Sequence, residues 1–481
     1  MKFVIQGELC LHDVQTMAQV FFHRIGFEVV DNVPINGLCL SLQRKARPGS
    51  AVWARLYENG VVAEFFRARI VENDANGLSR ATKLAIYSVL ALYTGHRPPW
   101  GLLTGIRPAK VAAKLLNIGL SDNEVQQELR TYYLIERCRA ELCTRIAHAQ
   151  KDIADQGTNA NTVSIYAAVP FCPSICHYCS FSSYPMDKYA KYQDSYVDAL
   201  VKELAFIGQM CRDKYVENIY IGGGTPTALN DANFEKLLAA ISDNFAVDKA
   251  KEYTVEAGRP DTITPAKLAA MGRRGVSRIS INPQTLNDAT LEKIGRRHTA
   301  SQFLDAYKMA REAGFDNINI DLILGLPGET PDDVGRTLEG ITALSPKSCT
   351  IHTLAVKRAS RLNLDAAVSL YAADTSQMRT MLAIVTARMD ALGLAPYYMY
   401  RQKNSPGNFE NVGYATPGFA CRYNIQMMEE TQTILAAGAG AVTKLVDAAQ
   451  SRINRVFNLR NPVEYSEKVD EMIGRKVNPG Y

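Results

Sequence analysis

Between residues 163 and 354 the chain alternates six short β-rich runs with segments long enough to form helices. The runs are VSIYAAV, NIYIG, YTVEA, RISIN, NINIDLIL and CTIHTL, and an amphipathic segment follows each of them. Strands that alternate with helices pair in parallel, and a parallel sheet needs cover on both faces. The alternation therefore predicts an α/β domain whose parallel sheet curves into a partial (β/α)6 barrel.

The segments on either side of this region follow other patterns. Residues 1–95 contain strand-like runs, two of which meet at Asn59-Gly60, a strong hairpin signal, and helical periodicity then continues to about residue 156. The polar stretch QGTNANT has the composition of a linker, and the alternation stops near residue 391. These boundaries predict three domains: an N-terminal α+β and helical domain at 1–156, the partial barrel at 163–390, and a small C-terminal domain at 391–481 that covers the substrate.

Composition excludes several classes of protein. Of the 481 residues, 47% are hydrophobic and 21% are charged, as in ordinary globular proteins. No apolar run is long enough to span a membrane, and the N-terminus MKFVIQGELCLHD lacks the apolar core of a signal peptide. We therefore expect a cytoplasmic protein whose ten cysteines do not form structural disulfides. The net charge of +5 includes no long run of Lys and Arg, so we expect no nucleic-acid partner.

Unusual residues follow the predicted strands at the ends where a barrel carries its functional groups. In parallel β/α barrels these ends are the loops after the carboxyl termini of the strands, which together form one rim. In strand order the candidates are Cys172 with Cys176 and Cys179, then Gly222 to Gly224, Glu256, Asn282 with Gln284, Asp321, and His352. The sequence therefore predicts one site to which all six strand ends contribute.

The three cysteines in VPFCPSICHYCSF are spaced four and then three residues apart. Zinc needs four tetrahedral ligands, and His177 could complete such a site. A set of buried structural thiols is a second interpretation. An iron–sulfur cluster is favoured, because thiolates are its usual ligands and a short loop can wrap three corners of a cubane. Three ligands leave one iron open, which suits a small molecule that must chelate the metal.

The CxxxCxxC motif after the first strand of a six-unit β/α region resembles that of the radical S-adenosylmethionine (SAM) superfamily. The resemblance implies a [4Fe–4S] cluster on Cys172, Cys176 and Cys179, with S-adenosylmethionine on the open iron. The cofactor then carries the radical chemistry, and no separate catalytic side chain is assigned. By position, the resemblance assigns cofactor contacts to Tyr166, Tyr178, Gly223, Gly224, Thr225, Glu256, Gln284, Arg296 and Asp321. From the residues alone, each of these also fits a turn, core, capping or surface role.

Further segments resemble the oxygen-independent coproporphyrinogen III oxidase (dehydrogenase) family, namely PFCPSICHYCSF, GGGTPT, LGLPGET, GRRH, PGFACRYN and GAGAV. PWGLLTGIRP, VEAGRPDTI and INPQTLND most resemble its HemZ-type branch. The resemblance implies a radical SAM oxidoreductase of porphyrin and haem biosynthesis that works under anaerobic conditions. Its reaction would convert two propionates of coproporphyrinogen III to vinyl groups and give protoporphyrinogen IX. The resemblance also implies a reductant such as flavodoxin or ferredoxin as a partner.

Two positions depart from sister branches of this family. The oxidases carry a fourth cysteine where this chain has Phe181, and the CxF form is similar to the haem-chaperone branch. That branch has a histidine in the segment CRHN, where this chain reads CRYN with Tyr423. Two other functions therefore stay open: haem binding by a chaperone-like protein, and radical methylation or ring cleavage of haem.

A tetrapyrrole with four carboxylates needs several cations around a wide apolar slot, and guanidinium groups bind carboxylates well. The candidates are Lys357, Arg358, Arg361, Arg401, Lys403 and Arg422, together with Tyr397, Tyr398 and Tyr400. A solvated basic surface is an equally good interpretation of each cation. Trp100 is expected to pack the N-terminal domain against the barrel rather than to contact a ligand.

Overall fold

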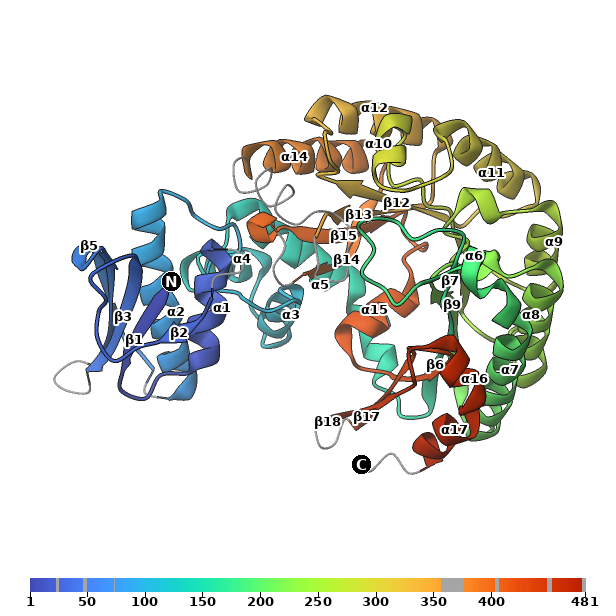
Figure 1. Ribbon diagram of the computed structural model, residues 1–481, viewed down its shortest axis with the longest axis horizontal. Helices are drawn as coiled ribbons and strands as arrows, with labels where there is room; N and C mark the ends of the chain where they lie inside the picture. Colours follow the sequence, from blue (N-terminus) through green and yellow to red (C-terminus); the bar gives the residue numbers. More distant parts are fainter. Residues whose placement is uncertain are drawn as a thin grey trace. The chain divides into compact units, whose positions relative to one another are not determined.

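The computed structural model describes residues 1–22, 26–45, 50–72, 74–355, 375–402, 406–447 and 452–477 (Figure 1). The chain divides into two compact units. The first contains Met1–Arg145 with the segment Arg401–Glu410, and the second contains Ile146–Tyr400 with Asn411–Tyr481. Among the predicted substrate-binding cations, Lys357, Arg358, Arg361 and Lys403 lie outside the described residues.

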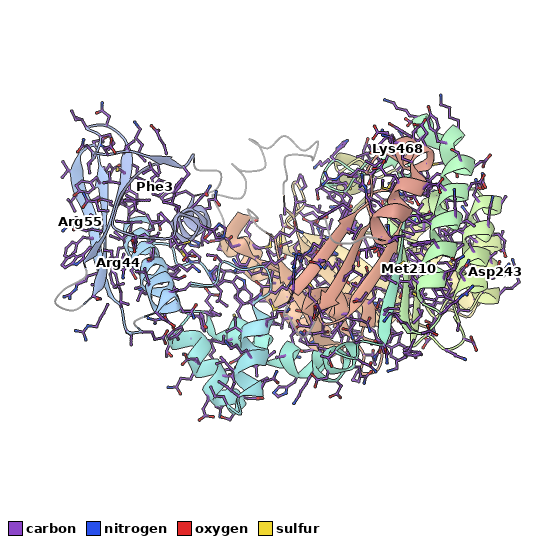
Figure 2. The ribbon with its side chains drawn as sticks, turned by 90° about the horizontal axis from the view of Figure 1, so that it is seen from below. Phe3, Arg44, Arg55, Met210, Asp243 and Lys468 are labelled. Carbon is purple, nitrogen blue, oxygen red and sulfur yellow. The ribbon has the colours of Figure 1, made fainter. Side chains whose placement is uncertain are left out.

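The first unit is built on a five-stranded sheet in the order β2-β1-β3-β4-β5, covered on one face by two helices. The elements are β1 (Lys2–Gln6), α1 (Leu11–Phe21), β2 (Glu28–Val29), β3 (Leu38–Lys45), β4 (Ala51–Glu58), β5 (Val61–Arg69) and α2 (Ala75–Thr94). The β4–β5 hairpin turns at Asn59 and Gly60, whose φ angles are 50° and 79°, as the sequence predicts. Phe3 and Val14 are fully buried in the core. Figure 2 shows Phe3 between the sheet and a helix, and Arg55 on the opposite face of the sheet.

Trp100 packs inside the first unit, against the segment Arg401–Glu410. Its ring is 1% exposed, and its indole N–H donates to the Glu410 carboxylate at 3.0 Å. Arg139 donates to the same carboxylate at 3.3 Å, and the Arg401 guanidinium lies 5.3 Å from the Trp100 ring centroid. The helices that complete this unit are α3 (Ala109–Asn117), α4 (Asp122–Thr131) and the start of α5 (Arg137–Gly157), which runs on into the second unit. Trp100 therefore has a packing role inside the first unit, and its expected contact with the barrel stays a prediction.

The second unit is organised around an eleven-stranded sheet in the order β14-β15-β13-β12-β11-β10-β9-β6-β16-β17-β18. Its middle consists of six parallel strands: β6 (Thr162–Val169), β9 (Tyr215–Gly223), β10 (Glu252–Val255), β11 (Arg278–Ser280), β12 (Ile318–Leu324) and β13 (Ser348–Thr353). These are the six predicted strands, so the α/β fold is confirmed. The helices between them line the outer side of the curved sheet (Figure 1): α7 (Gln193–Met210), α8 (Asp231–Asn244), α9 (Pro265–Arg273), α11 (Ala300–Glu312) and α12 (Pro331–Leu344). Within the described ranges, no helix combines the length and the hydropathy that a membrane crossing demands.

The residues beyond 391, expected to form a small C-terminal domain, add strands to both edges of this sheet. On one edge β15 (Glu410–Ala415) pairs antiparallel with β13 and is followed by β14 (Ala395–Arg401). On the other edge β16 (Thr433–Ala437) pairs in parallel with β6, and β17 (Val442–Asp447) and β18 (Arg452–Phe457) continue outward. Both edges of the six-stranded core are therefore paired, which satisfies their backbone groups.

Candidate functional site

The carboxyl ends of β6 and β9 meet at the loop that carries the cysteines. After β6 the chain forms the short strand β7 (Phe171–Cys172), which pairs with β8 (Tyr184–Pro185). The amide of Gly224, just beyond β9, donates to the Val169 carbonyl at 2.8 Å. A Cβ on Gly224 would lie 2.6 Å from the Phe171 carbonyl oxygen and 2.9 Å from the Cys172 sulfur. The close approach of the two segments therefore requires glycine at this position.

The three thiols lie close enough to act on one another's ionisation. Burial raises the pKa of Cys172 and of Cys179, and charge on Cys176 raises both further, while hydrogen bonds from neighbouring groups lower them. Three converging thiolates are costly without a cation, and a metal that binds them removes that cost. The donor set and the space left by Gly224 therefore fit a cluster held by three cysteines.

A single zinc ion fits this loop less well. In the part of the chain that the structure describes, no three His, Cys, Asp or Glu side chains are grouped as ligands of one metal ion. Thiolates of a cubane bind separate irons, so they stand further apart than the ligands of one zinc. His177, the candidate fourth ligand, instead places Nδ1 3.0 Å from the carbonyl oxygen of Lys293 at the end of α10 (Asp288–Lys293). His177 is thus engaged with α10, and the chemistry of three thiolate donors favours the iron–sulfur interpretation.

Arg259 lies beside the cysteine loop, and the sequence analysis missed it. It is 3% exposed, and a guanidinium nitrogen lies 3.8 Å from the Cys176 sulfur and 3.3 Å from the Ser174 hydroxyl. Asp261 fixes the fork with two hydrogen bonds of 2.9 and 3.1 Å. A buried guanidinium at this place offsets negative charge on the thiolates. The sequence could have indicated Arg259 as a site residue, because it follows the third barrel strand and so lies on the same rim.

Arg296 and Tyr178, both predicted cofactor contacts, lie together. The Arg296 Nε and one terminal nitrogen donate to the Tyr178 hydroxyl at 3.3 and 3.2 Å, and the other terminal nitrogen donates to the Asn282 carbonyl at 2.5 Å. Arg296 is 8% exposed. The contact places a guanidinium next to the cysteine loop, where a ligand carboxylate could replace the phenol as its acceptor.

Gln284 has the geometry of a residue held for a ligand. Its backbone is in the left-handed region, with φ of 73°, which is rare outside glycine, asparagine and aspartate. Its amide donates to the Asp321 carbonyl, and its carbonyl accepts from Ile323, both at 3.0 Å. Its side-chain oxygen is buried and has no hydrogen-bond partner among the described residues. An orphaned buried acceptor is costly, so it indicates a donor group supplied by a ligand.

Glu256 lies at the end of a stack of three tyrosines. The Tyr220 hydroxyl donates to Glu256 at 2.5 Å, and the Tyr220 ring stacks on Tyr423 at 4.4 Å and on Tyr166 at 6.1 Å between centroids. Tyr166 and Tyr423 also stack, at 5.9 Å. Tyr423, which stands where the chaperone branch has histidine, is 6% exposed. Its ring is therefore committed to this stack.

Asp321 of β12 is held by a residue of its own strand and by one of the neighbouring strand β13. Its carboxylate accepts from Asn319 at 2.7 Å and lies 3.5 Å from Nε2 of His352, whose Nδ1 is 3.2 Å from the Tyr400 hydroxyl. Burial alone raises the pKa of Asp321, but hydrogen bonds from His352 and from Asn319 outweigh it and hold that pKa below its ordinary value. By contrast, burial raises the pKa of Glu256 to about 7. The two carboxyl groups therefore differ in protonation near neutral pH.

Glu256→Gln is expected to stabilise the cofactor-free protein at high pH and not at low pH. The folded-state pKa is raised from 4.5 to about 7, so the unfolded chain releases this proton first and stability falls as the pH rises through that interval. The full cost above pH 7 is about 3 kcal/mol. Urea denaturation at pH 5 and pH 8 measures the difference between variant and parent. Glu312→Gln, on the exposed surface of α11, is the control and should give the same small change at both pH values; a pH-independent effect of Glu256→Gln would contradict the assignment.

Two predicted substrate-binding cations are used elsewhere, so those predictions are wrong. Arg401 is 5% exposed and donates to the carbonyls of Leu103 and Gly105 at 2.5 and 3.4 Å, within the first unit. Arg422 pairs with Glu217 at 2.5 Å, near the beginning of β9 and so at the end of the sheet opposite the rim. Tyr397 and Tyr398 are buried, and Tyr400 lies at His352. Sequence order alone could not assign these partners, because they come from distant segments.

Comparison with known proteins identifies the family of the chain. The model of the radical SAM superfamily matches residues 166–341. The chain is 38% identical over 422 residues to the oxygen-independent coproporphyrinogen-III oxidase-like protein HemZ of Bacillus subtilis, covering 86% of this chain and 83% of the relative. It is 30% identical over 311 residues to the haem chaperone HemW of Lactococcus lactis, covering 64% and 77%. Among solved structures it is similar to coproporphyrinogen III oxidase (HemN) of Escherichia coli, with a TM-score of 0.52, 23% identity, and coverage of 66% and 72%. The chain therefore belongs to the radical SAM superfamily, and within it to the family of oxygen-independent coproporphyrinogen-III oxidase-like proteins.

Proposed function

We propose that this protein is a radical SAM oxidoreductase that decarboxylates two propionates of coproporphyrinogen III to vinyl groups. The observation that carries the proposal is the rim, where three converging thiols, an orphaned Gln284 oxygen and the carboxyl groups of Glu256 and Asp321 face one site. The names of the relatives support a tetrapyrrole as the substrate class. As a radical SAM protein, the chain uses a [4Fe–4S] cluster and S-adenosylmethionine.

When bound, the reduced cluster and S-adenosylmethionine would supply the radical chemistry that removes hydrogen from the substrate. The thiolates of Cys172, Cys176 and Cys179 would hold the cluster, and Arg259 would offset their charge. Gln284 accepts a hydrogen bond from the ligand's amino group, and Arg296 binds its carboxylate in exchange for the Tyr178 hydroxyl.

The remaining residues place and shield the nucleoside. Asp321, kept ionised and oriented by His352, accepts hydrogen bonds from the ribose hydroxyls, and Glu256 lies at the same rim. The tyrosine stack keeps water from that side of the site. The proposed cofactor-binding set is Tyr166, Tyr178, Gly223, Gly224, Thr225, Glu256, Gln284, Arg296 and Asp321.

The test is the mass of the tetrapyrrole product. The protein is reconstituted anaerobically with iron and sulfide, reduced, and incubated with S-adenosylmethionine and coproporphyrinogen III. We expect 5′-deoxyadenosine together with a tetrapyrrole that has lost two carboxyl groups as CO2. Intact coproporphyrinogen beside abundant 5′-deoxyadenosine would contradict the proposal. The same assay with haem as the substrate would then distinguish methylation, seen as a gain in product mass, from ring cleavage, seen as an opened product.

A second candidate function is haem binding by a chaperone-like protein, favoured by Phe181 at the position of the fourth cysteine and by the likeness to HemW. Tyr423 argues against haem binding at this position. Its ring is 6% exposed and stacked on Tyr220, which leaves no room for it to act as a haem ligand. Stable haem binding without any decarboxylation, measured by absorbance titration, would support this alternative.

A further inference from the structure

The five-stranded sheet of the first unit has a second face, opposite the one on which α1 and α2 pack. The core side is marked by buried apolar residues of β4 such as Leu56. Because side chains alternate along a strand, Trp53, Arg55 and Tyr57 lie on the other side, and all three are partly exposed. Figure 2 shows Arg55 on that side of the sheet. We call the side of β3, β4 and β5 that carries these three residues the open sheet face.

Aromatic rings and arginines alternate over the open sheet face. In the β4–β5 register Trp53 is opposite Arg67, and Arg55 is opposite Phe65. Residues directly opposite each other on neighbouring strands lie on the same face, so each ring has an arginine beside it. The guanidinium groups of Arg55 and Arg67 lie 5.7 and 5.4 Å from the Trp53 ring centroid. Phe65 is 62% exposed, which indicates a surface that a partner covers.

The acidic residues of β4 and β5 lie on the other side of the sheet. The Tyr93 hydroxyl of α2 donates to Glu58, so this carboxylate is on the side that the helices cover. Glu64 is opposite Leu56 in the β4–β5 register and therefore shares the core side with it. Neither carboxylate can neutralise the arginines of the open sheet face.

The open sheet face consequently carries a net positive charge. Arg55, Arg67 and Arg69 take part in none of the ion pairs formed among the residues that the structure describes. At the far edge of the sheet Lys2 and Glu28 are 3.9 Å apart and cancel each other. The sequence shows no run of basic residues here, because alternation places an inward-facing residue between any two cations of one face. This charge therefore becomes visible only in the folded sheet.

Polar side chains of β3 border the aromatic and basic ones. Gln43 is opposite Trp53, and Ser41 is opposite Arg55. An amide and a hydroxyl can both donate and accept hydrogen bonds. The ribose 2′-hydroxyl likewise donates and accepts, and it is the group by which proteins distinguish RNA from DNA.

We infer that the open sheet face binds single-stranded RNA. Unpaired bases stack on exposed aromatic rings such as Trp53 and Phe65, and the neighbouring arginines offset the charge of the phosphates. Gln43 and Ser41 lie where they could bond to ribose hydroxyls. The inference is independent of the proposed function, because it uses residues of the first unit alone and involves no chemical step.

The first experiment measures binding of a fluorescein-labelled oligouridine of about twelve nucleotides to the full chain by fluorescence anisotropy at several salt concentrations. The variant is Arg67→Ala with Arg69→Ala, and the control is Arg130→Ala with Arg212→Ala, the same charge change at two exposed arginines outside this sheet. Each phosphate contact contributes about 0.7 to the slope of log affinity against log salt. We therefore expect the variant to have a slope shallower by about 1.4 and about tenfold weaker binding at low salt, and the control to match the parent.

The second experiment tests base stacking and the choice of RNA. Phe65→Ser should weaken oligouridine binding about fivefold or more, because a base loses its stacking partner. Phe457→Ser is the matched control, since Phe457 on β18 is 57% exposed, and it should bind as the parent does. The parent should bind an oligodeoxyuridine of the same length several-fold more weakly, and equal affinities would overturn the assignment to RNA.

Three further outcomes would overturn the inference. One is the absence of oligouridine binding by the parent at low salt, including the case in which the face binds coproporphyrin III instead. Another is an equal salt slope for the arginine variant and its control. The third is a dimer of the parent chain that Phe65→Ser abolishes, because a second copy would then occupy the face. Circular dichroism of each variant, compared with the parent, checks that the loss of binding is not a loss of fold.

Discussion

Replacing Cys172, Cys176 or Cys179 with alanine is expected to abolish the reconstituted cluster and all cleavage of S-adenosylmethionine. In the proposed cluster each thiolate would hold a separate iron, so loss of any one would leave a corner without a protein ligand. The three sulfurs sit in one loop whose geometry is fixed by the β7–β8 pair and by the close approach of Gly224. Iron and sulfide content, visible absorbance and the yield of 5′-deoxyadenosine measure the effect.

Cys211→Ala is the matched control for these variants. Cys211 is also a buried cysteine of the second unit, 5% exposed, but it lies at the end of α7 rather than in the loop. The control should keep a full complement of iron and the parent yield of 5′-deoxyadenosine. A cubane spectrum in all three loop variants would refute the ligand assignment, and loss of the cluster in the control would show that any cysteine substitution disturbs reconstitution.

Local patterns in the sequence predict the middle of the fold and the position of its site. The six parallel strands and the helices between them follow from short β-rich runs and amphipathic spacing, which depend on neighbouring residues. The rim follows from the rule that functional groups sit after strand ends, and it brings together Gln284 with Asp321 and Tyr178 with Arg296. These features are predictable because each depends on a residue's place in its own β/α unit.

Contacts between residues that are far apart in the sequence could not be predicted from local patterns. Arg259 meets Cys176 from 83 residues away, and Arg401 reaches the Leu103 carbonyl across 298 residues. The sequence of β14 to β18 does not reveal that these strands extend the central sheet. Their pairing depends on the unpaired backbone groups at the edges of that sheet, which local sequence does not show. The prediction that Arg422 would bind a substrate carboxylate failed for this reason, because Arg422 pairs with Glu217, a residue far away in the sequence.

A buried ion pair ties the C-terminal helix to the barrel. Glu203 of α7 is 0% exposed and Lys476 of α17 (Val469–Val477) is 3% exposed, with Nζ 2.6 Å from Oε1. Figure 1 shows α17 beside α7. The same carboxylate accepts from the Gly438 amide at 2.8 Å and from the Tyr465 hydroxyl at 2.5 Å. Gly438 in turn lies against Ala168 of β6, where an added Cβ would be 2.5 Å from the carbonyl oxygen. The pair therefore supports the strand that leads into the cysteine loop.

Lys476→Met is expected to lower the free energy of unfolding by about 3–5 kcal/mol, because it leaves the Glu203 charge buried without its cation. Arg475→Met is the matched control: its partner Glu471 is at 2.7 Å, but the two side chains are 38% and 52% exposed, and loss of such a surface pair costs about 1 kcal/mol or less. Urea denaturation of the full chain, followed by circular dichroism, compares the two variants.

Adding Glu203→Gln to Lys476→Met should recover most of the lost free energy of unfolding, since no unpaired charge then remains. Equal losses for Lys476→Met and Arg475→Met would contradict this account. If the account holds, the weakened support of β6 should also appear as faster loss of iron from reconstituted Lys476→Met than from Arg475→Met at the same temperature.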